Sequence, residues 1–191
     1  RMFSFNNPYG ACKTCGGLGY HMKIDPDLII PDKHLSLREG AVKASGWNIA
    51  EGGSMAMMYW EGLAARYGFS LDDPVARLPK HALDAILYGT GNERVAFTRH
   101  GAYGGGSYAA PFEGVVHNLE RRYRETQSDW MRADIEACMS REPCRDCGGG
   151  RLRKEILGVT VGGLNIYEFT CLPVNRELEF IEGLHLTERE N

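Results

Sequence analysis

Two Cys-x-x-Cys pairs near opposite ends of the chain constrain its fold more than any other feature. The first pair is Cys12 and Cys15, the second is Cys144 and Cys147, and glycines directly follow both pairs. Such pairs supply the four thiolates of a tetrahedral structural zinc site, because each presents two sulfurs at one tight turn. If the two pairs share one ion, the long segment between them is a domain inserted into a zinc-stapled base.

The same four cysteines allow other interpretations. A redox-active pair normally begins a helix after a buried strand, and neither pair here follows an apolar run. Two disulfides are not favoured, because nothing in the sequence marks the chain as secreted. We therefore favour one shared zinc ion, with two separate half-sites as the remaining alternative.

The composition fits a soluble globular protein. With 191 residues, of which 43% are hydrophobic and 25% charged, the chain can bury one large core or two smaller ones. Its net charge of −3 excludes a polycation, so a contact with nucleic acid must use a local patch or regions outside this chain. No stretch has the length of a membrane span, and no charged-then-apolar leader opens the chain. The chain begins at Arg1 and ends on charged residues, so we expect both ends to continue in a longer protein.

The two remaining cysteines, Cys138 and Cys171, have no partner nearby in the sequence and stand beside apolar residues. We expect both to be buried, reduced thiols. Reduced thiols together with a metal site indicate the cytoplasm.

The pattern of apolar residues predicts an α+β fold. Alternation predicts two strands before the second cysteine pair, at 20–25 and 95–98. Helical spacing predicts four helices, at 55–67, 79–88, 112–126 and 129–139. After the second pair we expect a strand at 156–161 and short helices at 166–170 and 173–181. We accordingly place a helix-rich inserted α+β domain at 45–137 and the zinc-containing base at 1–44 and 138–191.

Two features of the inserted segment have ordinary explanations. Met55 and Met58 recur with Leu63 at helical spacing, and a packed core face explains them better than a ligand groove. The glycine-rich segment 101–107 lacks the Gly-Lys-Ser/Thr sequence of a phosphate-binding loop. We expect a surface turn there, with a binding loop as the alternative.

Three arginines cluster near the end of the third expected helix, where cations also suit the helix dipole. Helix geometry aligns positions 121 and 124, whereas position 122 diverges by about a quarter turn. One interpretation is a phosphate-binding patch, and the other is a solvated helix end with ion pairs to Glu120 and Glu125. The candidate cationic residues, with possible neighbours in space, are Arg121, Arg122, Arg124, Arg99, His100 and Lys43.

Three blocks of the sequence carry a resemblance to a known family. The first is 3–12 with its CxxCxGLG continuation, the second is 111–115 with 118–123, and the third is 143–153 with 159–163. In this order and at about this spacing, the blocks resemble UvrA, the damage sensor of bacterial nucleotide excision repair. The stretch 44–98 carries little of the family's pattern.

The resemblance implies a role in DNA repair. UvrA proteins are dimeric damage sensors with two ABC-type ATPase modules, and they hand damaged DNA to the partner UvrB. This chain is similar to an internal piece of the first half, with the zinc module and part of the first signature domain at 1–44 and 138–191. The segment 45–137 would then be the insertion domain, which in the family grips the DNA duplex around a lesion.

The resemblance also implies roles for single residues. Arg121 and Arg122 match a characteristic basic pair, which favours phosphate contact for the candidate cationic residues. The residues that match the family's zinc ligands are Cys12, Cys15, Cys144 and Cys147.

The chain lacks a Walker A loop, a Leu-Ser-Gly-Gly signature and a Walker B strand. We therefore expect no ATP hydrolysis and no catalytic residues in it, with ATP and Mg²⁺ bound only by other parts of the parent protein. The partners that the resemblance implies are double-stranded DNA, the rest of UvrA, its dimer mate and, through other regions, UvrB. We expect no membrane partner, and the implied localisation is the bacterial cytoplasm.

A different class of function competes with this one. The CxxCxGxG motif also occurs in the cysteine-rich domain of DnaJ-type chaperones, which would make the chain a zinc-stabilised module that binds unfolded clients. That family repeats the motif four times at close spacing, and this chain has one full copy, at 12–19. A zinc hydrolase is excluded, because an all-cysteine site leaves no open coordination position for water. Binding of duplex DNA rather than of an unfolded client separates the two remaining functions.

Overall fold

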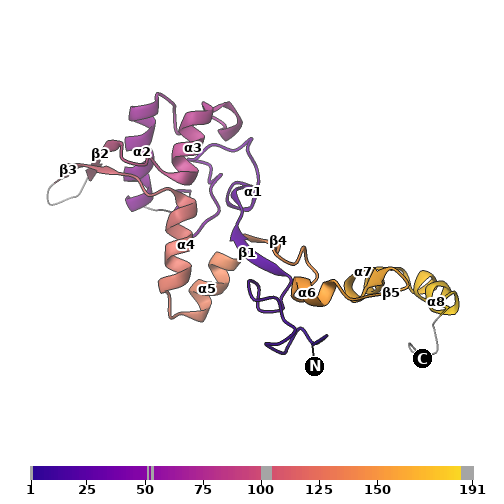
Figure 1. Cartoon of the computed structure of the whole chain (residues 1–191). Coiled ribbons are helices and arrows are strands. Elements are labelled where there is room, and N and C mark those ends of the chain that lie inside the picture. Colours follow the sequence, from indigo (N-terminus) through magenta and orange to yellow (C-terminus); the bar gives the residue numbers. More distant parts are fainter. Residues whose placement is uncertain (1, 51, 53, 100–104, 186–191) are drawn as a thin grey trace. The chain divides into compact units, whose positions relative to one another are not determined.

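The computed structural model describes residues 2–50, 52, 54–99 and 105–185, and it divides into two compact units (Figure 1). Unit 1 joins the two ends of the chain, Arg1–His21 and Arg141–Asn191, and unit 2 is the segment Met22–Ser140. Helices and strands both occur, which confirms the mixed helix and sheet fold. No helix in these described ranges is long and apolar enough to cross a membrane.

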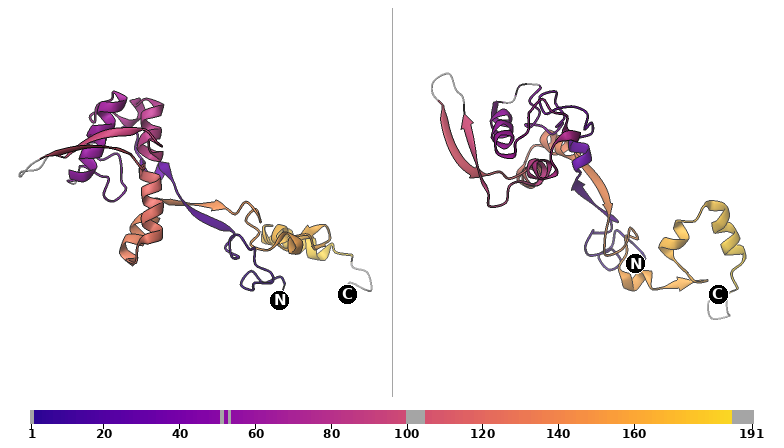
Figure 2. Two further views of the ribbon diagram at one scale, coloured as in Figure 1. Left: turned by 60° about the vertical axis from the view of Figure 1, so that its left-hand side comes forward. Right: turned by 90° about the horizontal axis from the view of Figure 1, so that it is seen from above.

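Unit 2 packs helices against one β-hairpin. Its helical elements are α1 (Pro26–Ile29), α2 (Ser54–Tyr67), the 3-10 turn η1 (Val75–Arg77), α3 (Lys80–Tyr88), α4 (Val115–Glu125) and α5 (Asp129–Glu136). Strands β2 (Arg94–Arg99) and β3 (Gly106–Pro111) pair antiparallel to form the hairpin. Helix α2 lies against β2, and α3 lies against both α2 and α4 (Figures 1 and 2).

One hydrophobic core joins these elements of unit 2. Strand alternation turns Val95 and Phe97 of β2 inward, and both side chains are buried. Trp60 and Leu63, one turn apart on α2, are fully buried in the same core. The indole Nε1 of Trp60 donates to the backbone oxygen of Trp47 at 3.1 Å, so this large side chain is buried without an unpaired polar group.

Two glycines allow the end of α3 to pack against the start of α4. Gly89, the C-cap of α3, has a φ of 90°, and Gly114, the N-cap of α4, has a φ of 86° and a ψ of 148°. A Cβ atom on Gly114 would lie only 2.3 Å from the backbone nitrogen of Gly89. The two helix ends therefore meet backbone to backbone. The helix expected at 112–126 begins only at Val115, because the conformation of Gly114 is not helical.

The segment 22–44 packs with unit 2, whereas the expected base extended to residue 44. Beyond α1 it has little regular structure, yet Ile29, Ile30, Val42 and Ala44 are buried in the same core as Trp60. These apolar side chains follow neither a helical nor a strand period, so periodicity could not assign them to a domain. On the other side, the division after Ser140 lies close to the expected boundary at 138.

Unit 1 contains both cysteine pairs and a run of short elements. These are α6 (Lys154–Leu157), β5 (Thr160–Val161), β6 (Leu164–Asn165), α7 (Ile166–Thr170) and α8 (Val174–Glu182). Strands β5 and β6 pair antiparallel in a tight hairpin. Asn165 then caps α7 by accepting the N–H of Glu168 at 2.9 Å, and the Glu168 side chain completes the capping box.

A third two-stranded sheet pairs β1 (Tyr20–Ile24) with β4 (Met139–Pro143). Its strands pass from one unit into the other, since the division falls within both. Close to the unit 2 end of this sheet, the N–H of Asp25 donates to the oxygen of Cys138 at 2.8 Å. The two chain passes that bound unit 2 are therefore adjacent at this point.

Most of the expected elements occur within a residue or two of their predicted bounds, and three expectations were wrong. The helix expected at 129–139 ends at Glu136, because Met139–Pro143 extend to pair with β1. Residues 156–161 are not one strand, since Ile156 is buried as part of the short helix α6. Cys171 is exposed rather than buried, because α7, which it caps, contributes no buried residue.

Candidate functional site

The four paired cysteines come together in unit 1. All four residues are buried, and their sulfur atoms lie within 4.8 Å of one another. The Sγ atoms of Cys12 and Cys144 are 3.9 Å apart, and those of Cys15 and Cys147 are 3.8 Å apart. These distances are too long for disulfides, which need about 2.05 Å, and all four cysteines are free thiols. Tetrahedral zinc with Zn–S bonds of ~2.3 Å spaces its sulfurs about 3.8 Å apart, so the cluster has the spacing of one metal site.

Backbone groups hold each pair in place around its sulfurs. The N–H of Gly19 donates to the Sγ of Cys15 at 3.2 Å, and the N–H of Gly148 donates to the oxygen of Cys144 at 2.7 Å. Gly17 has a φ of 86°, and a Cβ atom there would lie 1.9 Å from the backbone oxygen of Phe5. The glycines that follow the first pair are therefore required by the turn and by the chain that crosses it.

Two arginines after the second pair reach back to the first. The Nε of Arg151 donates to the oxygen of Gly17 at 2.8 Å, and the Nε of Arg153 donates to the oxygen of Ala11 at 3.3 Å. The guanidinium of Arg151 also lies over the ring of Phe5, 3.5 Å from its centroid. These side chains join the two ends of the chain within unit 1, so their role is structural.

The thiols of the cluster differ in proton affinity. Burial raises the pKa of Cys15, but hydrogen bonds from the N–H groups of Gly19 and Gly17 outweigh burial and lower this pKa to about 7. Burial raises the pKa of Cys147 to about 12, against the backbone hydrogen bonds that favour its thiolate. Of these two thiols, Cys15 therefore forms a thiolate more readily, and a bound cation would also stabilise the thiolate of Cys147.

The donor set fits zinc. Thiolates are soft ligands, and a buried set of four is typical of structural zinc rather than of magnesium or calcium. It leaves no coordination position open, so it fits a structural ion and not a catalytic one. Within the described ranges, this is the one group of three or more His, Cys, Asp or Glu residues placed to hold a metal ion.

The three arginines of α4 have different surroundings. Arg121 donates through Nε and Nη2 to the carboxylate of Glu113, at 2.8 and 3.1 Å, and through Nη1 to Glu125 at 2.9 Å. Arg122 donates to the backbone oxygen of Ser45 at 2.9 Å, and Arg124 is exposed. Two carboxylates thus neutralise Arg121, one of them the expected Glu125 and the other Glu113 instead of Glu120, and Arg124 is the most exposed of the three arginines.

The other candidate cations lie elsewhere in unit 2. Lys43 is exposed in the loop after α1, and Arg99 is exposed at the last position of β2. Figure 2 shows the β2–β3 hairpin extending away from α4. His100 lies outside the described residues.

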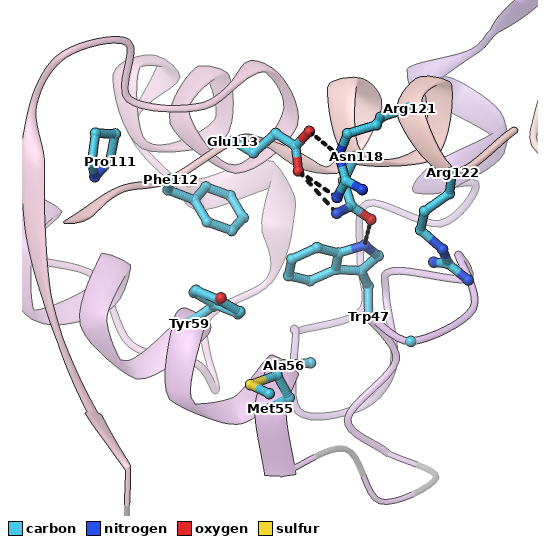
Figure 3. Close-up of a pocket in the computed structure, with 11 residues that line it drawn as sticks. Trp47, Met55, Ala56, Tyr59, Pro111, Phe112, Glu113, Asn118, Arg121 and Arg122 are labelled. Carbon is cyan, nitrogen blue, oxygen red and sulfur yellow. Dashed lines mark hydrogen bonds and ion pairs between the residues drawn. The ribbon is translucent and has the colours of Figure 1, made fainter. Parts of the chain in front are cut away.

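A cavity of about 330 Å³ opens in unit 2 beside α4 (Figure 3). The rings of Trp47, Tyr59 and Phe112 line one side, with centroids 5.4 to 5.7 Å apart. Asn118 accepts from the indole Nε1 of Trp47 at 3.3 Å and donates to Glu113 at 3.0 Å. The remaining lining residues are Gly46, Met55, Ala56, Pro111, Arg121 and Arg122.

No pattern in the sequence predicts this cavity. Trp47 and Tyr59 come from the stretch 44–98, which carries little of the family's pattern, and Trp47 lies in a loop where apolar residues follow no helical or strand period. The available signal was the polar set Glu113, Asn118 and Arg121 inside the second family-like block, of which Asn118 and Arg121 lie one turn apart on α4. Glu113 precedes the helix, so its contacts with these two side chains were not visible from helical spacing.

Replacement of Glu113 by glutamine is expected to lower the stability of unit 2 at neutral pH but not in acid. The guanidinium of Arg121 holds the pKa of Glu113 below its ordinary value of 4.5, against burial and with help from Asn118. A carboxyl whose pKa is depressed on folding stabilises the fold above its unfolded pKa, and this stabilisation is lost as the pH falls through the folded pKa. The Glu113 side chain is 40% exposed, so the effect at neutral pH is below about 1 kcal/mol.

Urea unfolding at about pH 7 and about pH 3 tests this expectation. The difference between the parent chain and Glu113→Gln should shrink in acid. The matched control is Glu120→Gln on the same helix, because Glu120 makes no ion pair in the described structure. An equal loss of stability for Glu113→Gln at both pH values would contradict the role of the ion pair.

Residues 25–137 match the family model of the UvrA DNA-binding domain. The chain is 43% identical over 191 residues to UvrABC system protein A of Clostridium perfringens and 42% identical over 195 residues to that of Bacillus subtilis. Each alignment covers 100% of this chain and 20% of the relative. The crystal structure of UvrA2 from Deinococcus radiodurans is similar with a TM-score of 0.58 and 30% identity, over 95% of this chain and 23% of that chain. The chain thus spans about a fifth of the length of the curated relatives it matches.

Proposed function

Because this chain belongs to the UvrA family, we propose that it is a DNA-contacting, zinc-stabilised internal module of a nucleotide-excision-repair damage sensor. In this role it helps an ATP-dependent UvrA dimer to grip duplex DNA around lesions. The observation that carries the proposal is the match of 25–137 to the family's DNA-binding domain, which nearly coincides with unit 2, Met22–Ser140.

The two units have separate roles in this proposal. Unit 2 is the insertion domain that contacts DNA, and unit 1 is the zinc module with part of the first signature domain. Cys12, Cys15, Cys144 and Cys147 hold one structural Zn²⁺, which ties the two ends of the chain together. The fit of four buried sulfurs to tetrahedral spacing supports this assignment.

Chemistry and further partners belong to the parent protein. The chain has no nucleotide-binding motif, so we propose that ATP and Mg²⁺ bind in other parts of UvrA and that this module has no catalytic activity. The dimer mate and UvrB are proposed partners of the parent, in the bacterial cytoplasm. Membership of the UvrA family leaves the chaperone alternative without support, and the cysteine pairs meet in one cluster rather than in the repeated motifs of DnaJ-type domains.

DNA binding by the 191-residue chain is expected to be weak, independent of sequence and strongly dependent on salt. An acidic chain offers few phosphate contacts, so a dissociation constant of roughly 10⁻⁴ to 10⁻⁶ M is expected at physiological salt. Of the candidate cations, Arg124 is the best placed phosphate contact, with Lys43 and Arg99 as further exposed contacts. Arg121 is less suited, because its removal would also leave Glu113 and Glu125 unpaired.

The test is fluorescence anisotropy with a labelled duplex over a series of salt concentrations. Arg124→Gln should weaken binding to all duplexes equally and reduce the salt slope by about one unit. The matched control is Arg77→Gln, which removes the same charge from an exposed position in η1 and should leave the slope unchanged. An unchanged slope for Arg124→Gln would remove Arg124 from the interface, and no binding to any duplex would refute the proposed function.

A further inference from the structure

We infer that the cavity beside α4 is a binding site for one unstacked nucleobase of the bound DNA, held by its aromatic rings and by Arg122. This inference rests on the proposed DNA-binding function. It adds a contact with a base to the contacts with phosphates, and it gives the module a direct means to favour DNA whose stacking is disturbed.

The size and the lining of the cavity suit a flat ring. Its volume of about 330 Å³ lies at the lower end of the range for small-molecule sites, roughly 300 to 1,000 Å³. Trp47, Tyr59 and Phe112 line it with aromatic rings that lie near one another in Figure 3, and Tyr59 is half-buried whereas Trp47 and Phe112 are buried. Every base has a π-face, so aromatic rings bind unstacked bases with little regard to sequence. Met55 is 57% exposed and lines the same cavity, so the cavity opens to solvent.

Arg122 is the polar group of the cavity that is left to bind a ligand. Arg121 is engaged by Glu113 and Glu125, and Asn118 is engaged by Trp47 and Glu113. In the described parts of the chain, Arg122 makes no ion pair, and its hydrogen bond to Ser45 uses one of the five N–H donors of a guanidinium. Its planar fork matches the paired acceptors on the edge of a base, as in bidentate arginine–guanine contacts.

The energetics decide which bases can enter. Extrusion of a base from an intact duplex loses stacking and pairing, and this loss is about as large as the gain from stacking on aromatic side chains. A base that is already unpaired loses less stacking and pairing free energy when it leaves the duplex. The cavity should therefore take up no base from an intact duplex, and it should strengthen binding to DNA in which one base is unpaired.

The 191-residue chain is tested with two labelled duplexes that differ by a single bulged thymine, at one salt concentration. The readout is the ratio of the two dissociation constants, which we expect to favour the bulged duplex roughly tenfold. Arg122→Gln should bring this ratio close to one, whereas the charge-matched Arg77→Gln should keep it. Both variants must retain the parent chain's thermal unfolding temperature.

A second variant reaches the same cavity without touching the core. Met55→Glu places a carboxylate at the exposed rim, in the first turn of α2, where an acidic residue suits the helix dipole. It should occupy Arg122, obstruct the cavity and also bring the ratio close to one.

The outcomes separate this inference from the proposed function. If both duplexes bind equally to the parent chain, or if the ratio survives in both Arg122→Gln and Met55→Glu, the inference is wrong and DNA binding stands. If neither duplex binds, the proposed function fails, and the inference fails with it. A free nucleotide is the other source of a base, so thymidine monophosphate is added as a competitor. Equal competition by the mononucleotide and the bulged duplex would show a nucleotide site rather than a contact with DNA.

Discussion

Exchange of Cys144 for serine is expected to abolish zinc binding and to unfold the region around the two cysteine pairs, while unit 2 keeps its core. Cys144 is completely buried and shares the cluster with three other thiols. Structural zinc contributes roughly 10–16 kcal/mol of apparent binding free energy, and this energy is coupled to folding. The hydrogen bonds of Arg151 and Arg153 contribute only about 1 kcal/mol each, so they cannot replace the ion.

The measurements are the metal content of the purified chain and the exchange of its backbone amides. The parent chain should hold one zinc ion, and Cys144→Ser none. Amides near 12–19 and 144–153 should exchange much faster in the variant, whereas those of α2 should remain protected. Chelation of the metal from the parent chain should give the same pattern.

Cys171→Ser is the matched control for this experiment. Cys171 is exposed and lies outside the four-cysteine cluster, so its replacement should leave metal content and exchange unchanged. Two ions per chain would contradict a shared site and restore the alternative of two half-sites. Full retention of zinc in Cys144→Ser would remove Cys144 from the ligand set.

Replacement of Gly114 by alanine should unfold unit 2 or nearly so. The backbone of Gly114, with a φ of 86° and a ψ of 148°, lies close to a region that is essentially restricted to glycine, and leaving glycine there costs about 1–3 kcal/mol. The new Cβ atom would also lie 2.3 Å from the nitrogen of Gly89 and 2.4 Å from the carbonyl carbon of Tyr88. Both are backbone atoms that cannot rotate away, and overpacking adds about 1–3 kcal/mol. These two costs together are a large part of the free energy of unfolding of a small domain, which is about 5–15 kcal/mol.

Gly68→Ala is the control for Gly114→Ala. Gly68 ends α2 with a φ of 69°, and a Cβ atom there would meet nothing within 4 Å. It tests the left-handed backbone alone, which costs about 1–2 kcal/mol. Urea unfolding followed by circular dichroism should show a moderate shift for Gly68→Ala and loss of the transition for Gly114→Ala. Equal shifts for the two variants would mean that the contact between Gly89 and Gly114 contributes nothing.

The features that could be predicted from the sequence are those that depend on local spacing. Two Cys-x-x-Cys pairs indicate a four-sulfur cluster wherever they lie, because each pair arranges its own turn. The strand Arg94–Arg99 buries one regular face, so its period is visible. Of the two methionines expected on the packed face of the helix Ser54–Tyr67, Met58 is buried, whereas Met55 is exposed.

The features that could not be predicted depend on contacts between distant segments. The sequence predicted that the preceding helix would continue to Met139. In the structure Met139–Pro143 is a strand instead, because it pairs with β1. The segment that carries Ile29, Ile30 and Val42 buries apolar side chains from turns, where no period exists. The cavity beside α4 needs rings from a loop, a helix and the end of a hairpin, and no sequence pattern joins Trp47 to Phe112.

The hydrogen bond between Asp25 and Cys138 places the two ends of the unit 2 core side by side. A segment whose ends meet can lengthen, shorten or change its surface while the flanking chain keeps its course. Evolution can therefore alter the hairpin, the arginines of α4 or the cavity without moving the cysteines that precede and follow them. Unit 2 is in this sense an interchangeable part, whose chemistry can diverge between relatives while its attachment to the rest of the protein stays the same.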